Sequence, residues 1–173
     1  MPRAKTHDAI TLILAPPTFL GVYAVTGSRD LALLTTLAML FSGFMFGPDL
    51  DIDSKQYARW GPFGFLWWPY RVIFRHRSRL SHGILLGTAI RVIYFIAVLI
   101  ALLGVGMWIV HLLRWPTLPE VSFQQVLREL WQIVRTVERR YLVAAFLGLW
   151  WGAVSHTLTD WLWGIWTNTK RIF

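Results

Sequence analysis

The sequence predicts an all-α membrane protein, a polytopic helical bundle with about four transmembrane helices and one amphipathic interfacial helix. Of the 173 residues, 55% are hydrophobic and only 15% are charged, whereas an ordinary soluble domain carries about 25% charged residues. The mean hydropathy is +0.49, so lipid is the expected solvent for much of the chain. The length fits a single membrane-embedded domain over residues 1–173.

The first two apolar stretches are expected to form a tight antiparallel hairpin. The first runs from Ala9 to about Gly27, barely the roughly 20 residues that a helix needs to cross the hydrocarbon. Pro16 and Pro17 lie inside it and indicate a broken or kinked helix. The second stretch runs from Leu31 to Gly47, and only residues 28–30 separate the two.

A polar segment and a long third span follow. Residues 48–81 are rich in Asp, Lys and Arg, so we expect them to form a cytoplasmic loop and not to enter the membrane. The third span lies within residues 83–113 and contains Arg91. Either it begins at Val92 and leaves His82 above the membrane, or it begins near His82 and Arg91 snorkels or faces the bundle interior.

The C-terminal part contains the amphipathic helix and the fourth span. In residues 121–140 the apolar side chains recur at a helical period, at Val126, Leu130, Ile133, Val134 and Val137. We expect this helix to lie on the membrane or to pack against a partner membrane protein. The fourth span begins at Tyr141 and continues to Trp166.

Composition and charge exclude several classes of function. The chain has no cysteine, which excludes disulfides, thiolate metal ligands and cysteine nucleophiles. The net charge is +8 and the pI is about 10.6, but basic residues beside apolar spans reflect topology and anionic headgroups. We therefore expect the lipid bilayer, and no nucleic acid, as partner. The N-terminus, residues 48–81 and the C-terminus share the side richer in Lys and Arg, which is predicted to be cytoplasmic.

Histidine and aspartate side chains are expected to gather at this cytoplasmic end of the bundle. With an up-down-up-down course, four separate stretches deliver the following residues to one face: His7, Asp8, Asp49, Asp51, Asp53, His76, Arg77, His82, His156 and Asp160. Burying such groups without partners would cost several kcal/mol each. A divalent cation is the expected partner, because Zn, Mn and Fe accept imidazole nitrogen and carboxylate oxygen; we expect Zn first.

The spacing of two pairs supports a shared ion. His156 and Asp160 are four residues apart and so lie on one face of a helix. Asp49 and Asp51 follow a proline, so an extended segment would point both side chains the same way. Each pair also has an ordinary interpretation, as a hydrogen-bonded helix pair and as turn formers. His111 lies at the far end of the third span and is not expected in the site.

Three short blocks occur in a fixed order: Pro48-Asp49-x-Asp51, then His76-Arg77 followed by Ser81-His82, then Ser155-His156-x-x-x-Asp160. They resemble the signature of the YdjM-like membrane-bound, metal-dependent hydrolases, and most closely a branch of uncharacterised metal-binding membrane proteins best known from cyanobacteria. The order is also loosely similar to zinc-dependent phospholipase C. The resemblance implies a bacterial inner membrane or a thylakoid membrane as the location.

Two functions follow as expectations. The first is metal-assisted hydrolysis of a phosphoester, such as a lipid, at the cytoplasmic surface. The expected metal ligands are His7, Asp49, His82, His156 and Asp160, with His76 or Asp51 as a further ligand or as a residue that orients one. Arg77 would bind phosphate, and Asp8 or Asp51 would be the general base. The second is a non-catalytic protein with a structural metal, which binds a membrane complex through residues 121–140.

Overall fold

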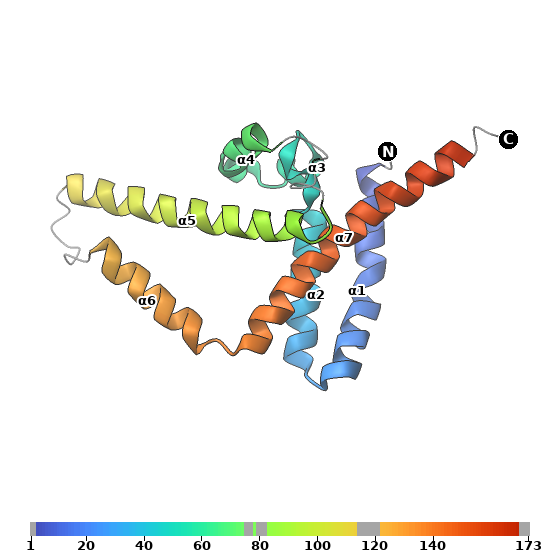
Figure 1. Ribbon diagram of the computed structural model, residues 1–173, viewed down its shortest axis with the longest axis horizontal. Coiled ribbons are helices and arrows are strands. Elements are labelled where there is room, and N and C mark those ends of the chain that lie inside the picture. The colour runs from blue at the N-terminus through green and yellow to red at the C-terminus, as the bar shows by residue number, and fades with distance from the viewer. Residues whose placement is uncertain (1–2, 75–77, 79–82, 114–121, 170–173) are drawn as a thin grey trace.

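The computed structural model describes residues 3–74, 78, 83–113 and 122–169, and every regular element in these ranges is helical (Figure 1). In chain order the elements are α1 (Ala4–Thr26), α2 (Arg29–Phe44), the 3-10 helix η1 (Pro48–Asp51), α3 (Lys55–Ala58), the 3-10 helix η2 (Gly61–Trp67), α4 (Trp68–Ile73), α5 (Leu86–Leu112), α6 (Phe123–Thr136) and α7 (Arg139–Thr169). Four segments are long and apolar enough to cross a membrane, namely α1, α2 with its continuation to Asp51, α5 and α7. The predicted all-α fold class is confirmed.

The predicted hairpin of the first two helices is also confirmed. Gly27 ends α1 with φ of 65°, in the left-handed region that glycine adopts without strain. The Ser28 hydroxyl then caps α2 by accepting a hydrogen bond from the Leu31 N–H. Pro16 and Pro17 do not break α1, which is continuous. Membrane helices tolerate proline because neighbouring helices and local adjustments satisfy the freed carbonyl groups.

The packing of α7 on α2 depends on two glycines of α7, Gly148 and Gly152. A Cβ atom at Gly148 would collide with the Thr35 carbonyl oxygen, and one at Gly152 would collide with the Met39 carbonyl oxygen. The two glycines lie one turn apart on one face of α7. This is the small-residue pattern that lets the backbones of two membrane helices approach closely. It fixes the position of the C-terminal half of α7.

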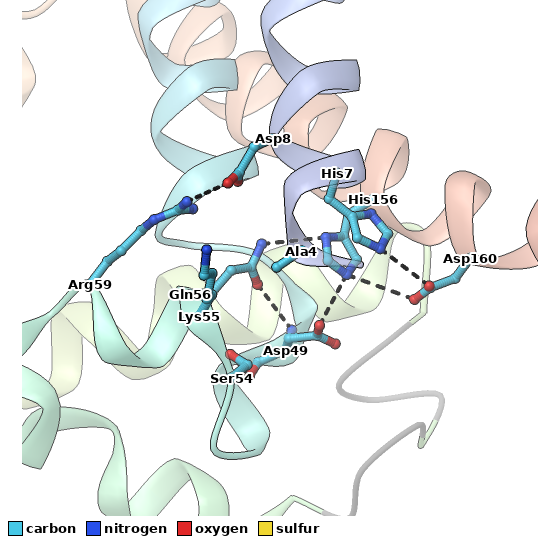
Figure 2. A pocket seen from close by; sticks show the side chains of 10 residues that line it. All are labelled: Ala4, His7, Asp8, Asp49, Ser54, Lys55, Gln56, Arg59, His156 and Asp160. Carbon is cyan, nitrogen blue, oxygen red and sulfur yellow. Dashed lines mark hydrogen bonds and ion pairs between the residues drawn. The ribbon is translucent and has the colours of Figure 1, made fainter. Parts of the chain in front are cut away.

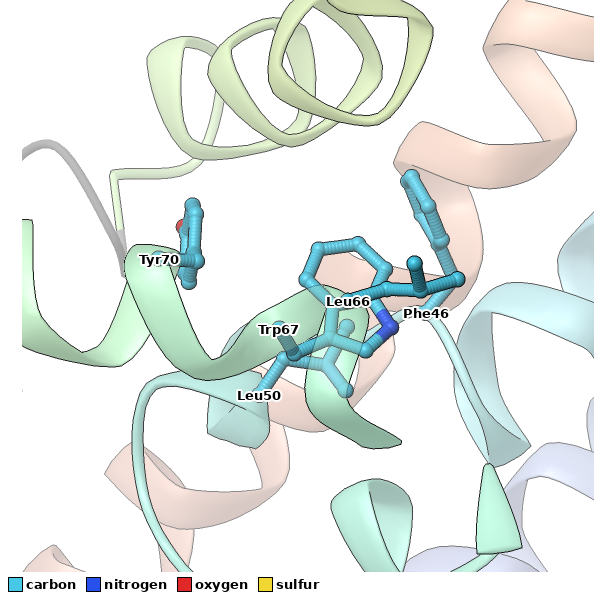
Figure 3. Packing of buried hydrophobic residues seen from close by; sticks show 5 residues of the cluster. All are labelled: Phe46, Leu50, Leu66, Trp67 and Tyr70. Carbon is cyan, nitrogen blue, oxygen red and sulfur yellow. The ribbon is translucent and has the colours of Figure 1, made fainter. Parts of the chain in front are cut away.

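The segment after α2 is folded, although the sequence indicated a polar loop. Its short helices enclose a cluster of buried side chains, which consists of Phe46, Leu50, Leu66, Trp67 and Tyr70 (Figure 3). Trp67 is 0% exposed and its ring stacks on Phe95 of α5, with centroids 5.7 Å apart. Trp67 therefore belongs to a buried core. The cluster attaches the start of α5 to the segment that carries Asp49.

The rest of α5 projects away from the unit formed by α1, α2 and α7, and α6 leads back to the start of α7 (Figure 1). The buried residues of α5 are Gly87, Thr88 and Arg91. Arg91 is only 1% exposed and donates a hydrogen bond to Thr88. It therefore faces the interior, which is one of the two alternatives left open by the sequence. The other residue in that question, His82, lies outside the described residues.

The predicted amphipathic helix is α6, and it is shorter than residues 121–140. It begins with a capping box, in which Ser122 and Gln125 satisfy each other's backbone N–H groups. None of its residues is buried. Its apolar side chains, among them Leu130, Trp131 and Ile133, are exposed. Its place on a membrane surface stays a prediction.

Candidate metal centre

The candidate site lies where the beginning of α1 meets η1 and the C-terminal half of α7 (Figure 2). His7 comes from the second turn of α1, and Asp49 from η1. His156 and Asp160 come from one face of α7, one turn apart. The close packing of α7 on α2 holds these two residues next to the segment that follows α2. Three segments distant in sequence thus meet at one end of the unit.

The distances between these side chains suit a shared ion better than direct hydrogen bonds. His7 Nε2 lies 3.4 Å from Asp160 Oδ1, and His156 Nε2 lies 3.7 Å from Asp160 Oδ2. His156 Nε2 lies 3.2 Å from Asp49 Oδ2. Charge-assisted N–H···O bonds are about 2.7–2.9 Å long. Ligands at the corners of a tetrahedron around zinc lie about 3.4 Å apart.

The two histidines are buried and incompletely hydrogen-bonded. His7 is 8% exposed and His156 is 6% exposed. Their rings stack, with centroids 3.8 Å apart. Within the described part of the chain, neither His7 Nδ1 nor His156 Nε2 has a hydrogen bond of acceptable geometry. One ligand atom from each of His7, His156 and Asp160 can be chosen so that all three lie within 4.8 Å of one another. These nitrogen and oxygen donors fit Zn, Mn or Fe.

Comparison with known proteins agrees with this geometry. A protein family described as "Uncharacterized metal-binding protein (DUF2227)" matches residues 2–171. The chain belongs to this metal-binding family. The metal-binding part of the predicted resemblance is thereby confirmed.

One relative adds a partial match. An "Uncharacterized protein" of Aquifex aeolicus (strain VF5) is 39% identical over 59 residues, which cover 34% of this chain and 41% of the relative. The matched region thus spans about two fifths of that relative's length. No solved structure matches the chain.

In this member of the metal-binding family, the buried side chain of Gln56 contacts two of the segments that carry the candidate ligands. Gln56 of α3 donates to the Gly43 carbonyl oxygen at 2.9 Å and accepts from the Asp49 N–H at 3.2 Å. Its Nε2 also lies 3.5 Å from His156 Nδ1. Gln56 therefore joins α2, η1 and α7 at the site. The sequence gives no signal for it, because a single glutamine has no recognisable pattern.

Removal of this support should weaken metal binding. We expect Gln56→Leu to raise the dissociation constant for zinc by about 10–100-fold, the usual cost of losing a residue that orients a ligand. The measurement is a competition titration with a chromophoric chelator in detergent. Gln132→Leu on the exposed face of α6 is the matched control, since it alters the same side chain far from the site. Equal affinities for the two variants would show that Gln56 does not orient the ligands.

The candidate ligands open onto a small cavity with a basic rim. Its volume is about 200 Å³, and its wall includes Ser54, Lys55 and Arg59 besides the candidate ligands. Arg59 is fixed by an ion pair with Asp8 at 2.6 Å and by a hydrogen bond to the Phe44 carbonyl oxygen at 2.9 Å. Asp8, predicted as a general base, is thus engaged by a guanidinium group. Lys55 and Arg59 were not among the residues selected from the sequence.

The remaining predicted residues are placed differently. Asp49 and Asp51 were expected to point the same way from an extended segment, and this was wrong because they lie in η1. A 3-10 helix has three residues per turn, so residues two apart point in different directions. Asp51 is buried and does not line the cavity. Asp53 is exposed in the turn after η1. His76, Arg77 and His82 lie outside the described residues.

Asp51 instead belongs to a polar group on the other side of η1. Burial raises the pKa of the Tyr70 hydroxyl, Arg91 opposes this rise, and the Asp51 carboxylate adds to it. The carboxylate and the guanidinium are thus within electrostatic reach of the same phenol. Asp51 thus lies near the buried Arg91 of α5 and does not line the cavity of the candidate ligands.

Proposed function

We propose that the protein is a metal-dependent hydrolase that cleaves a phosphoester at the cytoplasmic surface of a membrane. The observation that carries the proposal is the 3.2–3.7 Å spacing between His156 and the carboxylates of Asp49 and Asp160, beside a cavity with a basic rim. A bound divalent metal would supply a water of lowered pKa and polarise a phosphoryl oxygen. The membership in a metal-binding family and the resemblance to YdjM-like hydrolases support the same conclusion.

The residues that would hold the metal come from three described segments. They are His7, Asp49, His156 and Asp160, and the resemblance adds His76 and His82. Two imidazoles among the donors favour Zn, Mn or Fe over Ca or Mg, which prefer oxygen ligands. Zinc remains our first expectation. The N-terminus, residues 48–81 and the C-terminus carry the excess of Lys and Arg, which supports a cytoplasmic location for the site. The resemblance supports a bacterial inner membrane or a thylakoid membrane.

The basic rim would bind the anionic part of the substrate. Arg59 is held in place by Asp8 and by the Phe44 carbonyl oxygen, so its guanidinium is ordered before a ligand arrives. A guanidinium can bind two phosphate oxygens at once. We expect Asp8 to position Arg59, and the sequence-based role of Arg77 as phosphate ligand remains a further proposal. Lys55 adds a second cation to the rim.

The size of the cavity limits what enters it. At about 200 Å³ it is smaller than the roughly 300–1,000 Å³ of sites that enclose drug-sized ligands. A phosphate group fits, whereas the rest of the substrate must lie outside. A phosphoester at headgroup height, in which the organic part stays in or on the membrane, meets this condition.

Turnover by the metal-loaded protein tests the proposal. We expect the Zn-, Mn- or Fe-loaded protein to hydrolyse p-nitrophenyl phosphate or its bis ester, and Arg59→Gln to lower kcat/KM by about 100-fold. Arg128→Gln, a basic residue of exposed α6, is the matched control. Metal content is measured in parallel and should stay unchanged in both variants. Full metal occupancy without turnover on phosphomono-, phosphodi- and lipid phosphoesters would contradict the hydrolase.

A non-catalytic metal-binding role in a membrane complex is the second candidate. It is favoured by α6, whose exposed apolar side chains have no cover within the described part of the chain. In this case the metal would hold α1, η1 and α7 together, and α6 would bind a partner membrane protein. Metal-dependent stability with no turnover would distinguish this role from the hydrolase.

A further inference from the structure

Residues of α1, α2 and α7 line an apolar groove. Its lining residues belong to the Thr26 end of α1 and the Arg139 end of α7, and these helix ends lie away from the end of α1 that carries His7 (Figure 1). Its volume is about 840 Å³, and α1, α2 and α7 all contribute to its walls. A smaller hollow of about 320 Å³ continues along α1 as far as Leu14, and the two share Thr18, Gly21, Val22 and Trp151. The groove thus extends along the apolar part of two membrane-spanning segments.

The groove is a consequence of how α7 packs. Gly148 and Gly152 bring α7 against α2, and α1 packs mainly on α2, so α1 and α7 diverge below the His7–His156 stack. Gly21 faces the opening without a side chain, and a Cβ atom there would meet no atom within 4 Å. The Trp151 indole N–H donates to Thr18 Oγ1 at 3.1 Å, so these two polar groups of the wall are paired with each other. The lining is therefore largely apolar.

Two arginines stand at the mouth of the groove. Arg139 and Arg140 begin α7 and line the groove at its outer end. Arg140 is paired with Glu138 at 2.8 Å. Arg139 has no acidic partner within ion-pair distance in the part of the chain that the structure describes. A cation at the start of a membrane-spanning helix lies at headgroup height, where it can reach lipid phosphate.

We propose that this groove is a binding site for an anionic phospholipid, with an acyl chain along α1 and α7 and the phosphate at Arg139. The apolar walls favour a hydrocarbon chain, and the Arg139 guanidinium at the mouth favours a headgroup with net negative charge. The site is remote from the metal centre, and the proposal does not depend on catalysis.

Two variants separate the chain site from the headgroup site. Gly21→Phe is expected to fill the groove, because a Cβ atom at this position meets no atom within 4 Å. Gly106→Phe is its matched control, because a Cβ atom there also meets no atom within 4 Å but lies on α5. Arg139→Gln removes the cation, and Arg128→Gln on α6 is its control. All variants are made in the full chain, and their metal content is measured to show that the metal centre is intact.

The test is lipid binding to the detergent-purified protein, measured by native mass spectrometry with phosphatidylglycerol and phosphatidylcholine of the same acyl chains. We expect the wild type to bind phosphatidylglycerol about fivefold more tightly, from about 1 kcal/mol per basic residue near anionic lipid. Arg139→Gln should remove this preference, and Gly21→Phe should weaken binding of both lipids. Equal binding of the two lipids by the wild type, or unchanged binding by Gly21→Phe, would overturn the proposal. A dimer that is lost in Gly21→Phe would do so too, because it would assign the groove to a second copy.

Discussion

Replacement of His156 by alanine is expected to raise the dissociation constant for zinc by more than about 100-fold, beyond the cost of losing an orienting residue. His156 Nε2 lies 3.2 Å from Asp49 Oδ2 and 3.7 Å from Asp160 Oδ2. The His156 ring stacks on His7, and its Nδ1 lies 3.5 Å from Gln56 Nε2. His156 Nε2 lies near both carboxylates, and His7, whose Nε2 lies 3.4 Å from Asp160 Oδ1, is the second nitrogen donor of the described site. The variant therefore removes the central ligand.

The effect is measured by zinc competition titration of the metal-stripped protein in detergent. His111→Ala is the matched control, because His111 is exposed at the C-terminal end of α5, remote from the site. Circular dichroism establishes that both variants keep their helical content. If His156→Ala bound zinc as tightly as His111→Ala, His156 would not be a ligand.

Replacement of Gly152 by leucine is expected to destabilise the protein by about 3 kcal/mol or more, the upper range for overpacking. The new side chain would begin inside the space of the Met39 carbonyl oxygen, and backbone atoms of α2 cannot move aside as a flexible side chain can. Unfolding in a detergent mixture of increasing SDS content, followed by circular dichroism, measures the loss.

Gly164→Leu on the same helix is the control, since a Cβ atom there meets nothing within 4 Å. Gly152 precedes His156 by one turn, so a displaced α7 should also separate His156 from Asp49 and reduce metal content. A Gly152→Leu variant as stable as Gly164→Leu would mean that α2 and α7 do not pack through this glycine.

The elements that follow from hydropathy could be predicted from the sequence. Long apolar runs need no tertiary information, so the four long helices and the hairpin turn at Gly27 were anticipated. The fold of the segment around Trp67 could not be predicted in this way. Its charged residues are typical of a polar loop, and its aromatic residues form a core only because Phe95 of α5 packs against Trp67. An aromatic residue in a membrane protein is equally compatible with an interfacial position.

The candidate site was predictable in its residue types and not in its geometry. His156 and Asp160 could be placed on one face because helix periodicity fixes their relation. The different orientations of Asp49 and Asp51 follow from the 3-10 helix η1, which no local pattern in the sequence predicts. Gln56 and Arg59 reach the site only because α3 folds back onto α2.

The close contact at Gly152 was also missed from the sequence. A glycine in an apolar helix looks the same whether it faces lipid or another helix, and only the position of α2 distinguishes Gly152 from Gly164. The site therefore depends on packing that local patterns do not encode.

The most direct test of the metal centre is elemental analysis of the detergent-purified protein beside a His156→Ala/Asp160→Ala double variant. We predict about one equivalent of Zn, Mn or Fe in the wild type and none in the double variant, because the ligands that hold the ion have been removed. Both proteins should keep their helical content. Absence of metal from the wild type, even after incubation with each of the three ions, would contradict the metal centre proposed at His7, Asp49, His156 and Asp160.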